Sequence, residues 1–258
     1  MRDIKVCHKI EKEDQVKRCL LLAIGIVFVV ATTAHAVSLF GPAEPAAEPG
    51  KFSSGVGYFY YDDFWKNNGS FRILQNQLFA EGSYSFYKGV EVFMRFGGAD
   101  AQLPDLSPDS PFKDNMKPYG GIGARGVLYK FNPQFDIGGS LYVDRVWSDY
   151  VESVTPLGVV KLKAPWSANF ALLGEWTPYK VFVLYGGPKF FYGASTEDTR
   201  TLMNGMAVDS SRSIRTDSLV GGVLGTRFAI LGIEQLKLGL ELQFTNRVSV
   251  GGMASYSF

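Results

Sequence analysis

The sequence predicts an all-β fold, a membrane-spanning antiparallel up-and-down β-barrel of about ten strands. Two observations predict it. Leu236–Phe258 alternates apolar and polar residues in two runs around a turn at Asn246, and a period of two is typical of strands with one apolar face. Similar segments recur after residue 50, where no apolar run has the length of a spanning helix. Closing these strands into a barrel leaves no exposed edge.

Alternating segments and their connections set the expected strand order. Strands are expected near 52–61, 71–87, 89–98, 118–130, 134–147, 166–176, 179–192, 216–230, 235–245 and 247–258. Long polar loops are expected at 62–70, 99–117, 148–165 and 193–215, and the connections between them are short. Short turns at one end and long loops at the other are typical of outer-membrane barrels. Pro165 and several glycine pairs blur the segment boundaries, which also allow eight or twelve strands.

The N-terminal part has a different composition. Lys17 and Arg18 precede an apolar run and the tripeptide Ala34-His35-Ala36, which is the plan of a signal peptide cleaved after Ala36. We therefore expect a signal peptide at 1–36, a disordered segment rich in Pro, Ala and Glu at 37–50, and the barrel at 51–258.

Aromatic residues near strand ends indicate which face meets lipid. Two belts of such residues form the interfacial girdles of membrane barrels. Trp147 and Trp166 lie on the long-loop side, and the opposite side has Phe131, Phe135, Trp176, Tyr179 and Phe258. The apolar face of each strand should therefore point outward. The alternative is a soluble exported ligand-binding barrel, in which Leu236, Leu238, Leu240 and Leu242 would point inward.

An outward apolar face places charged residues in the lumen. A one-residue slip would push Arg125 into lipid, at a cost of about 2–4 kcal/mol, so the register is well fixed. The expected lumen charges are Glu81, Glu91, Arg95, Arg125, Asp136, Asp144, Glu175, Arg227, Lys237, Glu241 and Arg247. Their signs nearly balance, which favours a lumen filled by ion pairs, or a narrow channel, over an open pore.

Catalysis, cofactors and metals are not expected. Both histidines and both cysteines lie within residues 1–36, so the mature chain lacks the usual general base and thiol nucleophile. Adjacent Asp62 and Asp63 should point apart, and no ligand spacing supports a calcium site with Asp198 or Asp209. Removing residues 1–36 leaves twenty basic against twenty-one acidic residues, which does not indicate nucleic-acid binding.

Three features together resemble the small outer-membrane β-barrels of Gram-negative bacteria, the group that includes OmpA-type barrels, OmpW-like barrels and opacity-type porins. They are the leader ending Ala34-His35-Ala36, the alternating strands, and the terminal Val248-x-Val250-x-Gly252-x-Ala254-x-Tyr256-x-Phe258. The resemblance implies a monomer in the bacterial outer membrane, surrounded by lipid and lipopolysaccharide. It also implies that Tyr256 and Phe258 belong to the signal read by the barrel assembly machinery.

Several functions fit such a barrel. The leading hypothesis is a structural, surface-interaction or narrow-channel role without catalysis, and the alternative within the same fold is a small-molecule diffusion porin. The long loops at 99–117 and 193–215 favour surface interaction, and the lumen charges favour a channel. Arg212 and Arg215 could meet lipopolysaccharide phosphates at the membrane rim, or could be ordinary surface charge.

Overall fold

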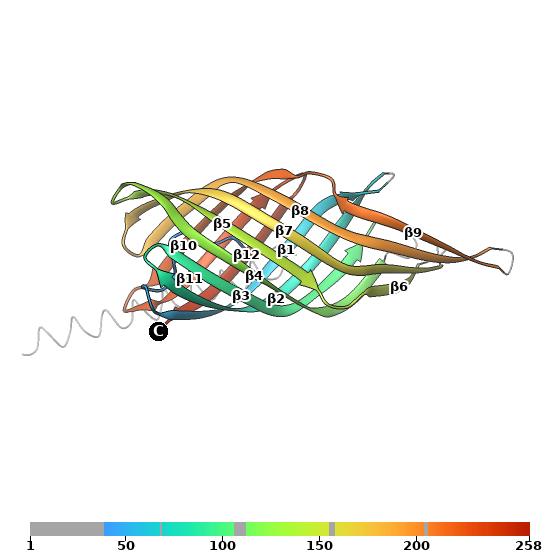
Figure 1. The fold of residues 1–258 in the computed structure, drawn as a ribbon, viewed down its shortest axis with the longest axis horizontal. Helices are drawn as coiled ribbons and strands as arrows, with labels where there is room; N and C mark the ends of the chain where they lie inside the picture. The colour runs from blue at the N-terminus through green and yellow to red at the C-terminus, as the bar shows by residue number, and fades with distance from the viewer. Residues whose placement is uncertain (1–38, 68, 106–111, 155–157, 204–205) are drawn as a thin grey trace, which may run out of the picture.

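A computed structural model describes residues 39–258 apart from 68, 106–111, 155–157 and 204–205. The expected signal peptide and its cleavage point lie outside these residues. The described chain forms one antiparallel sheet (Figure 1). Its strands are β1 (Phe52–Lys66), β2 (Ser70–Tyr87), β3 (Val90–Leu103), β4 (Phe112–Asn132), β5 (Phe135–Val146), β6 (Tyr150–Val154), β7 (Gly158–Tyr179), β8 (Phe182–Met203), β9 (Met206–Thr216), β10 (Val220–Ile230), β11 (Ile233–Phe244) and β12 (Val248–Ser257).

The strand pairings close the sheet into a barrel. Consecutive pairings run β1–β2–β3–β4–β5–β7–β8–β10–β11–β12 and return to β1. The closing pair runs from Ser53 opposite Ser257 to Tyr60 opposite Val250. Of the twelve strands, β6 and β9 are outside this ring. The predicted barrel with a ten-stranded wall is therefore confirmed.

The two additional strands prolong strands of the wall. β7 pairs with β5 over one part of its length and with β6 over the other. In the same way, β8 pairs with β10 and then with β9. The predicted loops at 148–165 and 193–215 are therefore largely strand, and β3 and β4 likewise extend into 99–117. Alternation did not reveal these extensions because the apolar side is short: Tyr150, Val160, Leu162 and Ile214 are buried at their base, and the residues beyond them on β8 and β9 are mostly polar.

The extensions form an arm at one end of the barrel. β7 and β8 have 22 residues each, whereas β12 has 10, and a spanning strand needs about 9–11. We call the described residues within 150–163 and 193–216 the arm. The barrel end that carries the arm is the long-hairpin end, and the opposite end is the short-turn end. Figure 1 shows β6, β8 and β9 projecting beyond the rest of the wall.

The outer surface of the wall is apolar. Ile122 on β4 is 63% exposed while Arg125 is 3% exposed, so this strand has the predicted register. On β11, Glu241 and Gln243 are buried, whereas Leu242 and Phe244 are exposed. Leu238 is buried against Ile230 and Phe228 rather than in the main lumen cluster, so the structure contradicts the soluble barrel with an inward leucine face. The predicted girdle aromatics are all exposed: Phe131, Phe135, Trp147, Trp166, Trp176, Tyr179 and Phe258. In the part of the chain that is described, no helix has the length and apolar character needed to cross a membrane.

Candidate functional site

The short-turn half of the lumen contains the first described segment of the chain. Residues 39–49, which we call the plug segment, have no helix or strand. Leu39, Phe40, Ala43, Ala46 and Ala47 within it are nevertheless buried. Residues 39–50 were expected to be disordered from their Pro/Ala/Glu composition, and their order in the structure comes from contacts with the barrel wall.

Three lumen carboxylates accept hydrogen bonds from the plug segment's main chain. Glu241 accepts from the amides of Phe40 at 3.0 Å and Gly41 at 2.9 Å. Glu175 accepts from the amides of Ala43 and Glu44, the latter at 3.1 Å. Glu91 accepts from the amide of Ala46 at 2.8 Å. Because an unpaired buried amide is costly, these carboxylates give an otherwise irregular segment the partners it needs.

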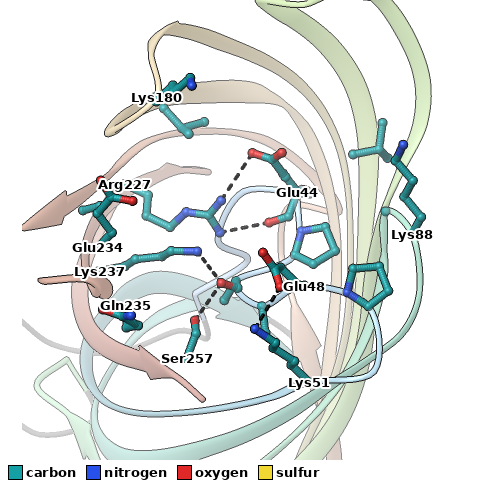
Figure 2. A pocket seen from close by; sticks show the side chains of 18 of the residues that line it. Glu44, Glu48, Lys51, Lys88, Lys180, Arg227, Glu234, Gln235, Lys237 and Ser257 are labelled. Atoms are coloured by element: carbon teal, nitrogen blue, oxygen red, sulfur yellow. Dashed lines mark hydrogen bonds and ion pairs between the residues drawn. The ribbon is translucent and has the colours of Figure 1, made fainter.

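Three lumen cations bind the carbonyl oxygens of the same segment. Arg227 donates to the carbonyl of Glu44 at 2.9 Å, and its guanidinium lies 3.7 Å from the Glu44 carboxylate. Lys237 donates to the carbonyl of Ala46, which also accepts from the Ser257 hydroxyl at 2.7 Å. Figure 2 shows these contacts. Arg125 reaches the carbonyl of Phe40 at 3.4 Å.

Apolar packing and glycines fit the plug segment to the wall. Phe40 and Ala43 pack in one buried cluster with Ala171, Leu173, Tyr185 and Val223. Gly41 has φ of +68°, and a Cβ there would lie 2.8 Å from a guanidinium nitrogen of Arg125. This position therefore needs glycine both for its backbone conformation and for the approach of Arg125.

The middle of the lumen holds an ion-pair cluster of Glu81, Glu91, Arg95 and Arg125. Glu81 faces Arg95 across β2 and β3, and Glu91 faces Arg125 across β3 and β4. The Glu81 carboxylate lies 2.6 Å from Arg95 and 2.9 Å from Arg125, which also pairs with Glu91. The Arg95 guanidinium lies 4.8 Å from the ring centres of Phe79, Phe93 and Tyr142.

Side chains of the wall, together with some from the base of the arm such as Leu162 and Ile214, fill the long-hairpin half of the lumen. The cluster there includes Phe59, Tyr61, Trp65, Tyr119 and Phe191, all nearly inaccessible to solvent. The Trp65 indole donates to the Tyr61 hydroxyl at 2.7 Å. A cavity lined by several of these residues measures about 40 Å³. It has room for only a few water molecules.

A larger cavity of about 790 Å³ opens at the short-turn end. Its walls are the residues from Glu44 to Pro49 and the neighbouring turns. The cationic lining residues are Lys51, Lys88, Lys130, Lys180, Arg227 and Lys237, and the acidic ones are Glu44, Glu48 and Glu234. The Lys51 ammonium 2.8 Å away holds the pKa of Glu48 below its usual range. We call this cavity the vestibule.

The remaining predicted lumen charges lie toward the two mouths. Asp136 pairs with Lys130 at 2.6 Å near the short-turn end. Asp144 accepts from the Ser167 hydroxyl at 2.6 Å. Arg247 lies between β11 and β12 at the long-hairpin end, half-exposed over the Phe64 ring and 3.7 Å from Asp62. It therefore lies at the mouth of the lumen rather than in its interior.

The sequence-based prediction of lumen residues omitted some polar side chains that point inward. Lys189 and Gln243 are buried and joined by a 2.7 Å hydrogen bond. Lys189 shares the strand face of Tyr185 and Phe191, so the alternation of β8 could have placed it in the lumen. Nothing in the local sequence could have placed the plug segment there, because its partners lie on β3, β7 and β11.

The acidic loop residues do not form a cluster that could hold a metal. Asp62 accepts two hydrogen bonds from Arg72 at 2.8 and 2.7 Å. Asp63 accepts from the amide of Phe64 at 2.8 Å. Across residues 39–258, apart from the undescribed gaps, no group of three or more His, Cys, Asp or Glu residues could bind one. Arg212 and Arg215 lie on β9 in the arm.

No family model and no curated protein matches the chain. Solved structures similar in fold include the outer membrane protease OmpT from Escherichia coli, at 9% identity, 81% coverage of this chain, 97% of that chain and a TM-score of 0.48. An outer membrane channel from Pseudomonas putida F1 has 13% identity, coverage of 86% and 100%, and a TM-score of 0.47. The outer membrane protein AlkL has 11% identity, coverage of 86% and 97%, and a TM-score of 0.44. At these values the likeness carries no argument about function, and the architecture rests on the strand pairings above.

Proposed function

We propose that this chain is a bacterial outer-membrane barrel that is closed to free diffusion and anchors a polar β-arm outside the membrane for surface interaction. The observation that carries the proposal is the plug segment, whose main chain is bound from three sides by Glu91, Glu175 and Glu241. A barrel that conducts small molecules needs an open passage. Here the described plug segment fills the short-turn half of the lumen, and wall side chains fill the other half.

The lumen is narrow at two successive levels. Next to the plug segment, a void bordered by Leu39, Gly41 and Arg125 measures about 20 Å³. Toward the long-hairpin end, the void beside Tyr61 and Tyr119 measures about 40 Å³. These two voids have room for only one to a few water molecules, which supports a vestibule that ends blindly. The diffusion porin is therefore the weaker candidate.

The arm suits a role outside the membrane. Ion pairs join its strands and base: Lys163 lies 2.6 Å from Asp198, and Lys161 lies 2.8 Å from Asp149. The Ser211 hydroxyl donates to Asp198 at 2.7 Å. A paired, polar hairpin presents fixed side chains to a partner at a lower ordering cost than a flexible loop.

The orientation follows from the same features. We place the long-hairpin end outside the cell and the short-turn end in the periplasm. In this placement Tyr256 and Phe258 lie at the periplasmic edge of the closing seam, where the Phe258 amide donates to the Phe52 carbonyl at 3.0 Å. The proposal also includes three further points. The protein is a monomer, the barrel assembly machinery recognises Tyr256 and Phe258, and the protein has no catalytic activity.

Planar-bilayer recording of the refolded protein tests closure. Heat-modifiability on a gel first establishes that the barrel has folded. We expect no stable conductance steps from the wild type, and steps of porin size would overturn the proposal. For the arm, deletion of residues 197–212, which spares the buried Ile214, should leave heat-modifiability intact and abolish binding of the protein to host or abiotic surfaces. Unchanged binding would count against the surface role.

A gated narrow channel is the second candidate. The observation that favours it is the vestibule of about 790 Å³, which borders the plug segment. Only non-covalent contacts hold this segment to the inner face of the wall. The double variant Glu175→Ala/Glu241→Ala removes four of the main-chain hydrogen bonds to that segment. New conductance in this variant would favour the channel, and continued silence would favour the closed barrel.

A further inference from the structure

A groove of about 620 Å³ lies on the outer surface of the wall near the long-hairpin end. Its apolar lining comes from β3, β4 and β5 and from the two girdle tryptophans: Met94, Phe96, Ile122, Val143, Trp147 and Trp166. All six side chains are exposed. The groove therefore belongs to the lipid-facing surface of the barrel and is separate from the lumen.

Glycine at position 120 allows the tryptophan rim of this groove to form. A Cβ on Gly120 would lie 2.8 Å from the ring of Trp147 and 3.0 Å from the carbonyl oxygen of Arg95. The Trp147 ring can lie against the wall at this point because no side chain intervenes. It also packs against Phe96, with ring centres 5.9 Å apart. The groove is therefore built by the wall rather than left by chance between flexible side chains.

Arg145 stands at the rim of the groove on the lipid-facing side. Asp144 and Val146, its neighbours along β5, are buried, whereas Arg145 is exposed like Val143 and Trp147. Trp166 is its partner across the β5–β7 pairing. No described residue makes an ion pair or hydrogen bond with its guanidinium, although most other cations near this end are paired. A cation on a lipid-facing wall needs an anion or water at the interface.

We propose that this groove is a binding site for a phosphorylated, acylated glycolipid of the lipopolysaccharide class. An acyl chain lies along Met94, Ile122 and Val143, and a headgroup phosphate accepts hydrogen bonds from Arg145. Guanidinium matches phosphate oxygens in a two-pronged geometry. Trp147 and Trp166 frame the point where the chain meets the headgroup, as interfacial tryptophans do.

The choice of this lipid rests on the proposed function, which places the long-hairpin end outside the cell. Lipopolysaccharide forms the outer leaflet there, and ordinary phospholipids form the inner one. The arm continues above Arg145 with polar side chains such as Lys161 and Lys163. A bulky sugar-phosphate headgroup can contact such a surface, whereas a glycerophospholipid headgroup is too small to extend along it.

Binding to the refolded barrel in detergent can be measured by native mass spectrometry. The probes are hexa-acylated bisphosphorylated lipid A, its dephosphorylated form, and phosphatidylglycerol. We expect Arg145→Gln to weaken binding of phosphorylated lipid A about tenfold, the effect of losing a charge-assisted contact. Binding of the dephosphorylated form should not change, and Arg145→Lys should restore part of the affinity. The control Lys88→Gln changes an exposed cation in the turn between β2 and β3, at the short-turn end, and should have no effect.

A second variant tests the groove without changing charge. Val143→Trp fills it with an apolar side chain that is still suited to lipid, and should weaken both lipid A forms alike. Equal lipid A binding by wild type and Arg145→Gln would overturn the proposal. Equal binding of phosphatidylglycerol and lipid A would overturn the choice of occupant. A protein that is not heat-modifiable, or that inserts with the arm on the periplasmic side, would instead contradict the proposed function.

Discussion

Main chain fills the short-turn half of the lumen, whereas side chains of the wall fill the long-hairpin half. In the first half, Glu91, Glu175 and Glu241 bind amides of the plug segment, and Arg227 and Lys237 bind its carbonyls. In the second, aromatic rings pack across the lumen. The ring of Phe59, for example, lies against Gly251, where a Cβ would collide with it.

This difference shows two ways to fill the interior of a barrel and to give its polar groups hydrogen-bond partners. A ring brings its own apolar surface and needs only a glycine opposite to make room. A buried carboxylate needs hydrogen-bond donors, and main-chain amides are compact donors that carry no charge. The ion-pair cluster lies between the halves, and Arg125 belongs to both, since it binds Glu81, Glu91 and the carbonyl of Phe40.

The largest effect is expected where the two halves meet. Arg125→Ala leaves Glu91 without its ion-pair partner and Glu81 with Arg95 alone. We expect the free energy of unfolding to fall by about 3–5 kcal/mol, the usual result of breaking a buried ion pair. Urea unfolding in lipid vesicles, followed by tryptophan fluorescence, measures it. Lys130→Ala, which removes an exposed pair with Asp136, is the control, with an expected loss of about 0–1 kcal/mol. Similar losses of unfolding free energy in the two variants would contradict the view that the buried ion-pair cluster stabilises the barrel.

The second largest effect should distinguish the half of the lumen filled by the plug segment from the half filled by side chains of the wall. In Glu175→Ala/Glu241→Ala the plug segment loses hydrogen bonds to two charged acceptors, each worth about 1.5–3 kcal/mol. A cysteine placed at Ala43, which is fully buried, should then react at least tenfold faster with a maleimide reagent. Tyr61→Phe, which removes the Trp65 hydrogen bond in the other half, should leave that rate unchanged. Acceleration by both variants would mean that the halves are not independent.

Backbone conformation within the plug segment should have a smaller effect. Gly41 in the plug segment and Gly50 directly after it both have positive φ, but of the two only Gly41 has a neighbour where a Cβ would stand. Gly41→Ala should therefore weaken docking by about 1–2 kcal/mol from the left-handed backbone, with further loss from crowding of Arg125. Gly50→Ala should cost only the free energy of the left-handed backbone, without the loss from crowding. The cysteine reaction rate compares them, and a slower reaction in Gly41→Ala would refute the reasoning.

The smallest effect concerns the exposed pair Glu48–Lys51 in the vestibule. Its Lys51 partner lowers the pKa of Glu48, so the attraction is present above the ordinary glutamate pKa and is lost as pH falls through the lowered value. Exposed pairs contribute little. We expect Glu48→Gln to leave the cysteine reaction rate unaltered at pH 7, relative to the same cysteine protein with Glu48. A rate change as large as that of the carboxylate double variant would show that this pair, rather than Glu175 and Glu241, holds the segment.

The sequence was informative where the membrane imposes a pattern. Alternation located the ten wall strands and placed Arg125, Glu175 and Glu241 on the inner face, because lipid on one side forces an apolar residue at every second position. It was less informative for β6 and β9, where only a few residues such as Tyr150 and Ile214 are buried and most of the others are polar. It was also misleading for residues 39–50, whose composition indicates disorder because their stabilising partners are supplied by distant strands.

The plug segment also has a consequence for the order of folding. Its contacts with Glu91, Glu175 and Glu241 join residues 45, 131 to 132 and 200 to 201 positions apart. Contacts between such distant parts of a chain form late, because the intervening chain must be organised first. The earliest part of the described chain therefore reaches its final place only after β11, near the end of the sequence, has joined the sheet. Burial of Ala43 thus reports completion of the barrel, and its rate of protection would time the last step of assembly.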